Sequence, residues 1–163
     1  MVQPALLPTS SLLALQTLQQ SLCGCTTIDG SIAIDLSTVP ATPDSTSAQL
    51  TASNFSFLEQ VQEVTGYLEL KGVRVADKLS LPSLTVIHGR ELKNGRALVI
   101  DSVVAPAGVT FPTLSEIVTG DAYFSGVSGV CGYANVDWSD ILSNGTLQEG
   151  NTSACVQGVC GWR

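Results

Sequence analysis

Apolar residues recur along this chain in a short unit, written Φ-x-x-Φ-x-Gly, where Φ is any apolar residue. Copies begin at Cys25, Val61 and Leu84, and a fourth copy, which has one extra residue before its glycine, begins at Leu114. Each copy is too short to bury its own apolar face, so successive copies are expected to stack. The pattern therefore predicts a mostly β protein, a solenoid of parallel strands with a glycine at each corner.

Alternating apolar residues follow the glycine of each copy, as expected for a strand with one buried side. In the third copy the alternation over residues 97–100 predicts a strand buried in the core. The residues expected to point inward after the four glycines are Ile32, Ile34, Leu68, Leu70, Leu92, Ala122 and Phe124.

Two short helices are expected to cover the ends of this solenoid. Leucine spacing predicts a helix over residues 10–21, capped by Ser10 or Ser11 and stopped by Gly24. Because the segment carries no Lys or Arg, it fits a capping helix better than a membrane-surface helix. Near the other end, apolar residues at helical spacing from Trp138 predict a second short helix.

Residues 37–53 break the repeat pattern. The stretch is rich in Ser, Thr, Pro and Ala and has almost no large apolar residues, so it cannot pack as a repeat. An exposed loop, open to O-glycosylation, is expected here.

The overall charge excludes several kinds of partner. The 163 residues carry a formal net charge of -7 with only 7 Lys and Arg, whereas nucleic acids and anionic membranes are bound by clustered positive charge. The one basic concentration, at Arg90, Lys93 and Arg96, is typical of a solvated edge. No stretch reaches the roughly 18 apolar residues of a membrane span. One domain without nucleic-acid or membrane contacts is expected.

Cysteines and glycosylation sequons indicate an extracellular chain. The sequons lie at Asn54, Asn144 and Asn151. Because His88 is the only histidine, the usual four-ligand zinc site is incomplete, and no metal or cofactor is expected. An odd number of cysteines leaves at least one without a partner in the chain, and the pairing of Cys23 stays open. The cysteines are Cys23, Cys25, Cys131, Cys155 and Cys160.

Catalysis by this chain is not expected. Solenoids of this kind also include hydrolases that use paired carboxylates, and the candidates here are Asp121, Asp137 and Asp140. Asp137 and Asp140 flank the tryptophan of the expected closing helix, where acids complement the helix dipole. His88 lies beside no Ser or Cys in sequence and is expected at a solvated corner.

The order of the repeats resembles the receptor L domain of the epidermal growth factor receptor and insulin receptor families. The segments that carry the resemblance are CTTIDGSIAI, FLEQVQEVTGYLEL, LTVIHGRELKNGRALVI, LSEIVTGDAYFSG and VCGYANVDWSDIL. Their order, their spacing and a closing Cys-x-x-Ala-x-x-x-Trp arrangement match together, from about Leu12 to Cys160. The resemblance implies a single-stranded right-handed β-helix with short capping helices and terminal disulfides.

The resemblance also implies how the cysteines pair. Cys131 would pair with Cys155, and Cys25 would pair with a cysteine upstream of this chain. Cys160 would belong to a following furin-like cysteine-rich module. The implied division is a receptor L domain over residues 1–154 and the start of that module over residues 155–163.

Function is implied by the same resemblance. L domains of these families bind polypeptide hormones or growth factors on one sheet face, ahead of a membrane span and a tyrosine kinase. The expected partner is a polypeptide growth factor or insulin-like ligand, with receptor dimerisation, at the cell surface. The alternative is a secreted decoy or a surface adhesion protein without a kinase. Because the first residues lack the basic region of a signal peptide, this chain is expected to be part of a longer protein.

Five side chains are candidates for ligand contacts, because aromatic and basic anchors dominate polypeptide interfaces. They are Tyr67, Arg90, Lys93, Arg96 and Tyr123. Tyr67 and Tyr123 follow repeat glycines by a similar step, so both are expected on one sheet, although each could instead pack at a repeat edge. The positions that match the aromatic hormone contacts of the insulin receptor are Lys93, Asn94, Arg96 and Asp101, so insulin binding by that surface is not implied.

Peptide mapping tests the implied pairing. Under non-reducing conditions, protein secreted from eukaryotic cells is expected to yield one linked peptide pair that contains Cys131 and Cys155, because disulfides persist outside the cell. Recovery of both residues as free thiols would contradict the extracellular assignment.

Overall fold

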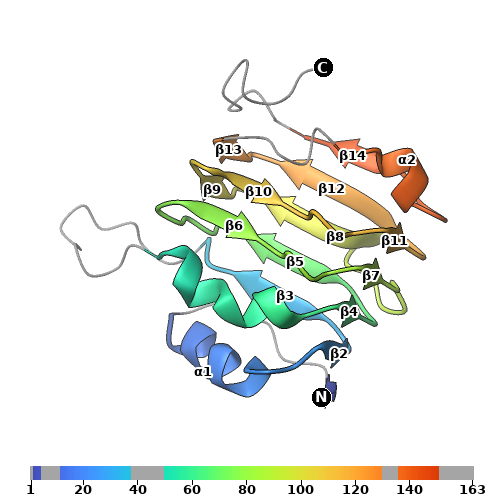
Figure 1. The fold of residues 1–163 in the computed structure, drawn as a ribbon. Coiled ribbons are helices and arrows are strands. Elements are labelled where there is room, and N and C mark those ends of the chain that lie inside the picture. The colour runs from blue at the N-terminus through green and yellow to red at the C-terminus, as the bar shows by residue number, and fades with distance from the viewer. Residues whose placement is uncertain (1, 5–11, 38–49, 130–135, 151–163) are drawn as a thin grey trace.

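Parallel strands dominate the structure, a computed structural model that describes residues 2–4, 12–37, 50–129 and 136–150. Within these ranges the protein is mostly β-structure with little helix. Figure 1 shows the strands layered one above another, in an order that follows the order of the sequence repeats. The predicted mostly β class is therefore confirmed.

Two five-stranded sheets form the body of the molecule. The first sheet has the order β1 (Val2–Pro4), β2 (Thr27–Asp29), β4 (Glu63–Val64), β7 (Val86–Ile87) and β11 (Glu116–Ile117). The second sheet has the order β14 (Leu147–Glu149), β12 (Asp121–Ser125), β8 (Arg96–Asp101), β5 (Leu68–Lys71) and β3 (Ile32–Asp35). Two smaller pairs join β6 (Lys78–Ser80) to β10 (Gly108–Thr110) and β9 (Val104–Ala105) to β13 (Ser128–Gly129).

Each repeat contributes one strand to each large sheet, and the paired strands are parallel. In the second repeat, Val64 ends β4, and Leu68 begins β5 opposite Leu98 of the next repeat. The repeat glycines lie where neighbouring backbones approach closely. At Gly89 φ is +68°, and a Cβ would lie 1.9 Å from the carbonyl oxygen of Thr119. Only glycine fits such a corner without displacing the neighbouring repeat.

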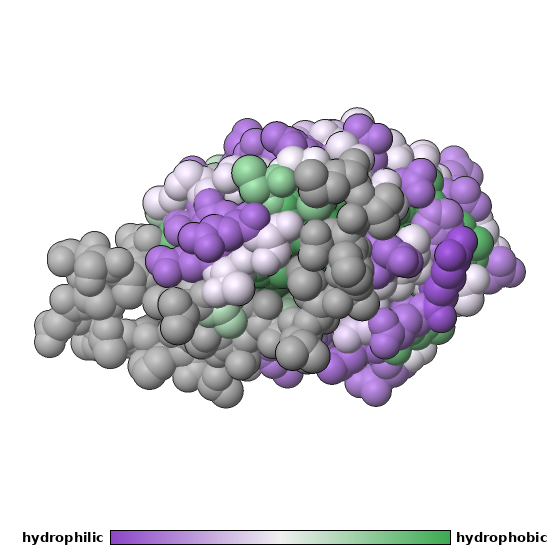
Figure 2. All heavy atoms as spheres, turned by 90° about the horizontal axis from the view of Figure 1, so that it is seen from below, coloured by the Kyte–Doolittle hydropathy of each residue, from purple (hydrophilic) through white to green (hydrophobic). Residues whose placement is uncertain are grey.

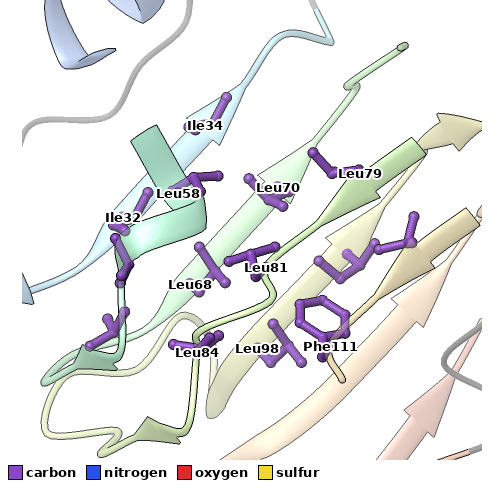
Figure 3. Packing of buried hydrophobic residues seen from close by; sticks show 14 of the residues in the cluster. Ile32, Ile34, Leu58, Leu68, Leu70, Leu79, Leu81, Leu84, Leu98 and Phe111 are labelled. Atoms are coloured by element: carbon purple, nitrogen blue, oxygen red, sulfur yellow. The ribbon is translucent and has the colours of Figure 1, made fainter. Parts of the chain in front are cut away.

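The core lies between the sheets. Figure 3 shows Leu68 and Leu70 of β5 beside Leu79 and Leu81, which approach from the opposite side. Burying an aliphatic side chain of this size contributes about 1.5–3 kcal/mol. The inward residues of the second sheet, each no more than 1% exposed, are Ile32, Ile34, Leu68, Leu70, Leu98, Ile100, Ala122 and Phe124.

The prediction that the third repeat leads inward at Leu92 is wrong. Leu92 is 36% exposed, and the strand begins only at Arg96. Lys93 and Arg96 exchange backbone hydrogen bonds of 2.9 and 3.0 Å across Asn94 and Gly95. Both intervening residues have positive φ, 52° and 81°, as a two-residue type I′ hairpin turn requires. The third repeat therefore carries an inserted hairpin ahead of its buried strand.

Helix α1 (Leu12–Leu22) lies below β2 and β3, at the N-terminal end of the stack (Figure 1). Its leucines at positions 15, 18 and 22 are buried, whereas Gln16 and Gln20 are exposed. Gly24 follows with φ +80°, so the helix ends where the sequence predicts. Figure 2, seen from below, shows hydrophilic side chains over much of the described surface on this side, with smaller hydrophobic areas between them.

Helix α2 (Trp138–Ile141) lies at the other end of the stack, beside β11 and β14 (Figure 1). The Asp137 carboxylate accepts a hydrogen bond of 3.1 Å from the backbone N–H of Ser139, which caps the helix. The Trp138 ring packs 5.1 Å from the ring of Phe124, between centroids. This helix therefore covers the core at the fourth repeat.

The predicted loop over residues 37–53 ends earlier than expected. Leu50 already forms a parallel bridge, and the 3-10 helix η1 (Ala52–Gln60) begins two residues later. The side-chain oxygen of Asn54 accepts a hydrogen bond of 2.9 Å from the backbone N–H of Thr51. This local capping pair starts the helix inside a stretch whose composition indicated only loop.

Several expectations concern residues that the structure does not describe. They are the cap at Ser10 or Ser11, loop residues 38–49, Cys131, Cys155, Cys160, Asn151 and the domain boundary at residue 154. Of the two N-terminal cysteines, Cys23 is exposed and Cys25 is buried. Among the described helices, none is long and apolar enough to cross a membrane.

Replacing Ile100 by Ala should lower the free energy of unfolding by roughly 2–5 kcal/mol, because Ile100 is fully buried on β8. Chemical denaturation monitored by circular dichroism measures the change. The half-exposed Leu92→Ala is the control and should cost less than about 1 kcal/mol. Equal midpoints for the wild-type protein and Ile100→Ala would exclude the buried placement of β8.

Candidate ligand-binding face

The outer side of the second sheet carries a row of side chains fixed by strand register. In β12, Ala122 and Phe124 are buried, so Tyr123 points to the opposite side. Strand pairing places Tyr123 opposite Val99 and Gln148, and Val99 opposite Glu69. We call this outer side the tyrosine face, and it consists of Ala33, Tyr67, Glu69, Lys71, Arg96, Val99, Asp101, Asp121, Tyr123 and Gln148.

Arg96 and Tyr123 are in direct contact on the tyrosine face. The guanidinium carbon of Arg96 lies 3.7 Å from the centre of the Tyr123 ring. The Arg96 Nε–H also donates a hydrogen bond of 3.3 Å to Oε1 of Gln148. A cation held over an aromatic ring in this way is attracted to its negative face. The two side chains therefore form one preorganised aromatic and basic anchor.

Asp121 holds the edge strand β14 in place beside this anchor. Its carboxylate accepts hydrogen bonds from Gln148 Nε2 at 2.6 Å and from Thr146, through the backbone N–H at 2.7 Å and the hydroxyl at 3.2 Å. The carboxylate of Asp121, a candidate for hydrolytic catalysis from the sequence, therefore already accepts hydrogen bonds from two residues. Asp137 is likewise occupied, and its hydrogen bonds with Ser139 lower the pKa of its carboxyl below the ordinary value.

The inserted hairpin bends toward the neighbouring strands. Lys93 Nζ lies 4.0 Å from Oε1 of Glu69 on β5. Glu91 accepts a hydrogen bond of 2.7 Å from the hydroxyl of Ser31, which precedes β3. Lys93 of the hairpin and Glu91 just before it thus contact two successive repeats. The insertion shapes the tyrosine face as well as lengthening the third repeat.

Tyr67 lies at the start of β5 and is half-buried. Its backbone N–H donates a hydrogen bond of 3.1 Å to Ser31 Oγ. Burial raises the pKa of the Tyr67 phenol above its ordinary value, and the negative charges of Glu69 and Glu91 raise it further. The phenol is therefore held in its neutral form beside two carboxylates.

The structure brings four of the five predicted contact residues to one region. Arg96 and Tyr123 are in contact, and Lys93 and Tyr67 lie near Glu69. Arg90 instead lies at the corner after β7, where its backbone N–H donates to Thr65 O at 2.9 Å. Sequence reasoning missed Glu69, Glu91 and Gln148, although the alternation of residues 67–71 already placed Glu69 on the same side as Tyr67.

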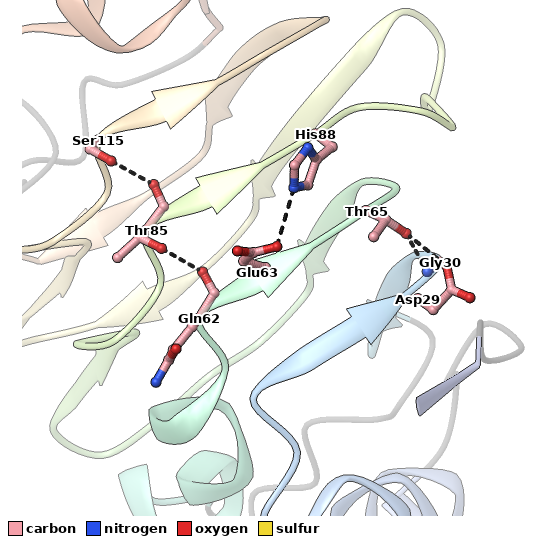
Figure 4. Close-up of polar contacts among 8 residues, drawn as sticks. All are labelled: Asp29, Gly30, Gln62, Glu63, Thr65, Thr85, His88 and Ser115. Carbon is pink, nitrogen blue, oxygen red and sulfur yellow. Dashed lines mark hydrogen bonds and ion pairs between the residues drawn. The ribbon is translucent and has the colours of Figure 1, made fainter. Parts of the chain in front are cut away.

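Polar side chains on the first sheet largely bind the neighbouring backbone, as Figure 4 shows. The Thr85 hydroxyl donates to the Gln62 carbonyl at 3.0 Å, and the Ser115 hydroxyl donates to the Thr85 carbonyl at 3.0 Å. His88 is not at a fully solvated corner as expected, since its side chain is 28% exposed and its Nε2 lies 3.4 Å from Glu63 Oε2. This face uses its polar groups to join successive repeats.

The described residues give no sign of a metal centre. Residues 2–4, 12–37, 50–129 and 136–150 contain no group of three or more His, Cys, Asp or Glu that could hold a metal ion. Two sequon asparagines make local hydrogen bonds: Asn54 at the cap of η1, and Asn144, whose Nδ2 donates to Val118 O at 3.0 Å.

Comparison with known sequences bears on the family. Residues 24–142, well over half of the chain, match the family described as Receptor L domain. The chain belongs to the receptor L domain family. The resemblance seen in the repeat segments is thereby confirmed. The matched region ends at Leu142, just after α2.

The curated relatives of this L domain are receptors by name. It is 26% identical over 141 residues to receptor tyrosine-protein kinase erbB-4 of Homo sapiens and of Mus musculus, an alignment that covers 83% of this chain and 11% of each relative. It is 32% identical over 101 residues to the epidermal growth factor receptor of Drosophila melanogaster, covering 57% of this chain and 7% of that receptor. The L domain thus spans about a tenth of the length of these relatives.

Replacing Glu91 by Gln should lower the pKa of the Tyr67 phenol, because one carboxylate that disfavours the phenolate is removed. Ultraviolet titration of tyrosinate at alkaline pH measures the shift, and Tyr67→Phe assigns the transition. Since folding raises this pKa, the stability linked to Tyr67 is present below the unfolded pKa and is lost as the pH rises through the folded pKa. An unchanged titration in Glu91→Gln, with exposed Glu149→Gln as the control, would contradict this arrangement.

Proposed function

We propose that this L domain binds a polypeptide growth factor outside the cell and that the tyrosine face is its binding surface. The observation that carries the proposal is the stacked pair of Arg96 and Tyr123, held by Gln148 on a rigid parallel sheet. Aromatic and Arg side chains supply most of the binding energy at polypeptide interfaces. Because this anchor is already ordered in the free domain, binding costs little side-chain entropy.

The finer architecture is part of the proposal. Residues 1–154 would form a single-stranded right-handed β-helix of the L-domain kind, and residues 155–163 would begin a furin-like cysteine-rich module. Each repeat adds one strand to each of the two large parallel sheets, which supports the β-helix. The proposed disulfides are Cys131 with Cys155, and Cys25 and Cys160 with cysteines outside this chain.

The binding role is proposed to be non-catalytic. The kinase activity named for the erbB-4 relatives would belong to parts of those proteins outside the matched region. The Drosophila relative is named a receptor for epidermal growth factor, which makes growth factors of that kind the first ligands to test. We place the domain in a receptor ectodomain that acts as a dimer, with insulin-like ligands as the second class to test.

Glycans at the sequons would leave the tyrosine face open. Asn54 lies on η1, and Asn144 binds the backbone beside β11 of the first sheet. Neither asparagine belongs to the outward rows of β5, β8 and β12. Glycosylation at these two positions is thus compatible with ligand access to the second sheet, whereas Asn151, the third proposed site, lies outside the described residues.

The same face would also serve a secreted decoy or a surface adhesion protein. The coding sequence that follows residue 163 separates these possibilities. A cysteine-rich region, a membrane span and a kinase would make the protein a signalling receptor. A stop codon after the cysteine-rich region would make it a decoy, with the binding role of the domain unchanged.

Surface plasmon resonance with a panel of secreted epidermal-growth-factor-like polypeptides tests the proposed face. Tyr123→Ala and Arg96→Ala should each weaken the binding of a responding growth factor by about thirtyfold, as expected for truncated anchor residues. Arg74→Ala is the matched control, because the Arg74 side chain is exposed and its backbone forms an isolated bridge with Val104, outside the second sheet. A growth factor that binds all three variants as tightly as the wild-type protein would place its site elsewhere.

A further inference from the structure

Glu69 is a carboxylate on the outer side of the second sheet, and it is buried together with the two residues beside it, Ala33 and Val99. It lies in the middle of β5, where its neighbours along the sheet are Ala33 of β3 and Val99 of β8. Glu69 is 7% exposed, and its side chain alone is 9% exposed. Acidic side chains are rarely buried to this extent unless they are paired.

The interactions of Glu69 are few for a carboxylate that is buried to this extent. Within the described ranges its one ion pair is with Lys93, at 4.0 Å, and no side-chain hydrogen bond reaches its carboxylate. Lys93 comes from the turn of the inserted hairpin, and its side chain is 45% exposed. The flanking side chains of Ala33 and Val99 carry no hydrogen-bond donors. Glu69 has therefore lost most of its water without gaining the donors that a buried carboxylate needs.

Nothing in the fold requires an acid at this position. The equivalent residues in the neighbouring strands are Ala33 and Val99, which the sheet accommodates without a polar partner. The carboxylate of Glu69 thus departs from the apolar residues that the other repeats have at this position. Glu69 lies between Tyr67, on its own strand, and Tyr123, two strands away. Aromatic rings on both sides suit the alkyl stem and the planar head of a basic side chain.

We propose that Glu69 is the acceptor for an Arg or Lys side chain of the polypeptide that binds the tyrosine face. This inference rests on the proposed function and names the chemistry of its partner. In the free domain Lys93 pairs with Glu69, and Lys93 moves away with its hairpin when the basic side chain of the partner binds. A guanidinium group fits best, because it can supply two parallel hydrogen bonds to one carboxylate.

The direction of the charge preference follows from the surroundings. The Arg96 guanidinium group already contacts the Tyr123 ring and Gln148. The Asp121 carboxylate already accepts hydrogen bonds from Thr146 and Gln148. Among the carboxylates of this face, that of Glu69 accepts no hydrogen bond from the described residues. A partner that inserts an acid here would place two carboxylates together, which costs binding energy. The face therefore selects for a basic residue at its centre.

A displayed library of random 12-residue peptides provides the probe. Peptides are selected on the wild-type domain and depleted on Tyr123→Ala, so that binders of the tyrosine face remain. Each remaining peptide is then resynthesised with every Arg replaced by citrulline, a neutral isostere, and every Lys replaced by norleucine. Affinities are measured for the wild-type domain, for Glu69→Gln and for Glu116→Gln, a matched charge change on the exposed side of the first sheet.

The expected result is a basic residue common to the face-directed peptides. Its neutral replacement should weaken binding to the wild-type domain at least about tenfold and should leave binding to Glu69→Gln unchanged, because the two changes remove the same ion pair. Glu116→Gln should bind like the wild-type domain. Lys93→Ala should bind the same peptides more tightly, since the competing cation is gone.

Other results overturn the inference in distinguishable ways. Face-directed peptides that bind the wild-type domain and Glu69→Gln equally would overturn the role of Glu69 and leave the proposed face intact. If no selected peptide is lost on Tyr123→Ala, the proposed face itself fails and the inference fails with it. Tighter binding of acidic peptides would reverse the charge preference and overturn it as well.

Thermal unfolding gives a readout that does not depend on a ligand. Glu69→Gln should keep or raise the midpoint by up to a few degrees, because the desolvated charge is removed while its shape is kept. The exposed Glu116→Gln should change the midpoint little. A fall of several degrees in Glu69→Gln alone would show that the carboxylate serves the fold, and it would overturn its assignment to a partner.

Discussion

In-register parallel pairing between successive repeats is the constraint on which the rest of this structure depends. A strand exposes alternate residues on opposite sides, so a shift of one residue would turn every buried side chain outward. Leu68, Leu98 and Ala122 lie opposite one another and are fully buried, which fixes the register of β5, β8 and β12. The glycine corners permit this pairing because they let neighbouring backbones approach without a Cβ between them.

The tyrosine face follows from the same constraint. Once the inward residues are fixed, Glu69, Val99 and Tyr123 must form a row on the outside, although they are far apart in sequence. Two departures from the simple repeat then give that row its chemistry. The inserted hairpin brings Lys93 to Glu69, and the edge strand β14 brings Gln148 to Arg96. A regular scaffold thus positions an irregular set of charged and aromatic groups, as expected for a binding domain built on a rigid frame.

The two large sheets differ in how some of their polar side chains are used. On the first sheet, hydroxyl groups such as those of Thr85 and Ser115 bind carbonyl groups of adjacent segments and so join the repeats. On the second sheet Asp121 also binds the backbone of Thr146, but the side chains of Arg96 and Tyr123 contact each other, and no described residue donates a hydrogen bond to the carboxylate of Glu69. The first sheet therefore contributes mainly to cohesion, whereas the second sheet retains groups that a partner can complete. This difference supports the proposal that the second sheet binds the ligand.

The sequence by itself determined the repeat, the parallel strands, both terminal helices and the membership of the receptor L domain family, because these depend on local periodicity and on glycines at fixed spacing. It misplaced Leu92, since an Asn-Gly turn inside a repeat interrupts the expected step to the core. It also identified Tyr67, Lys93, Arg96 and Tyr123 as candidates without showing that they gather around Glu69. Only the tertiary structure decided that arrangement, because burial and charge pairing between different repeats are set by stacking and leave no local pattern in the chain.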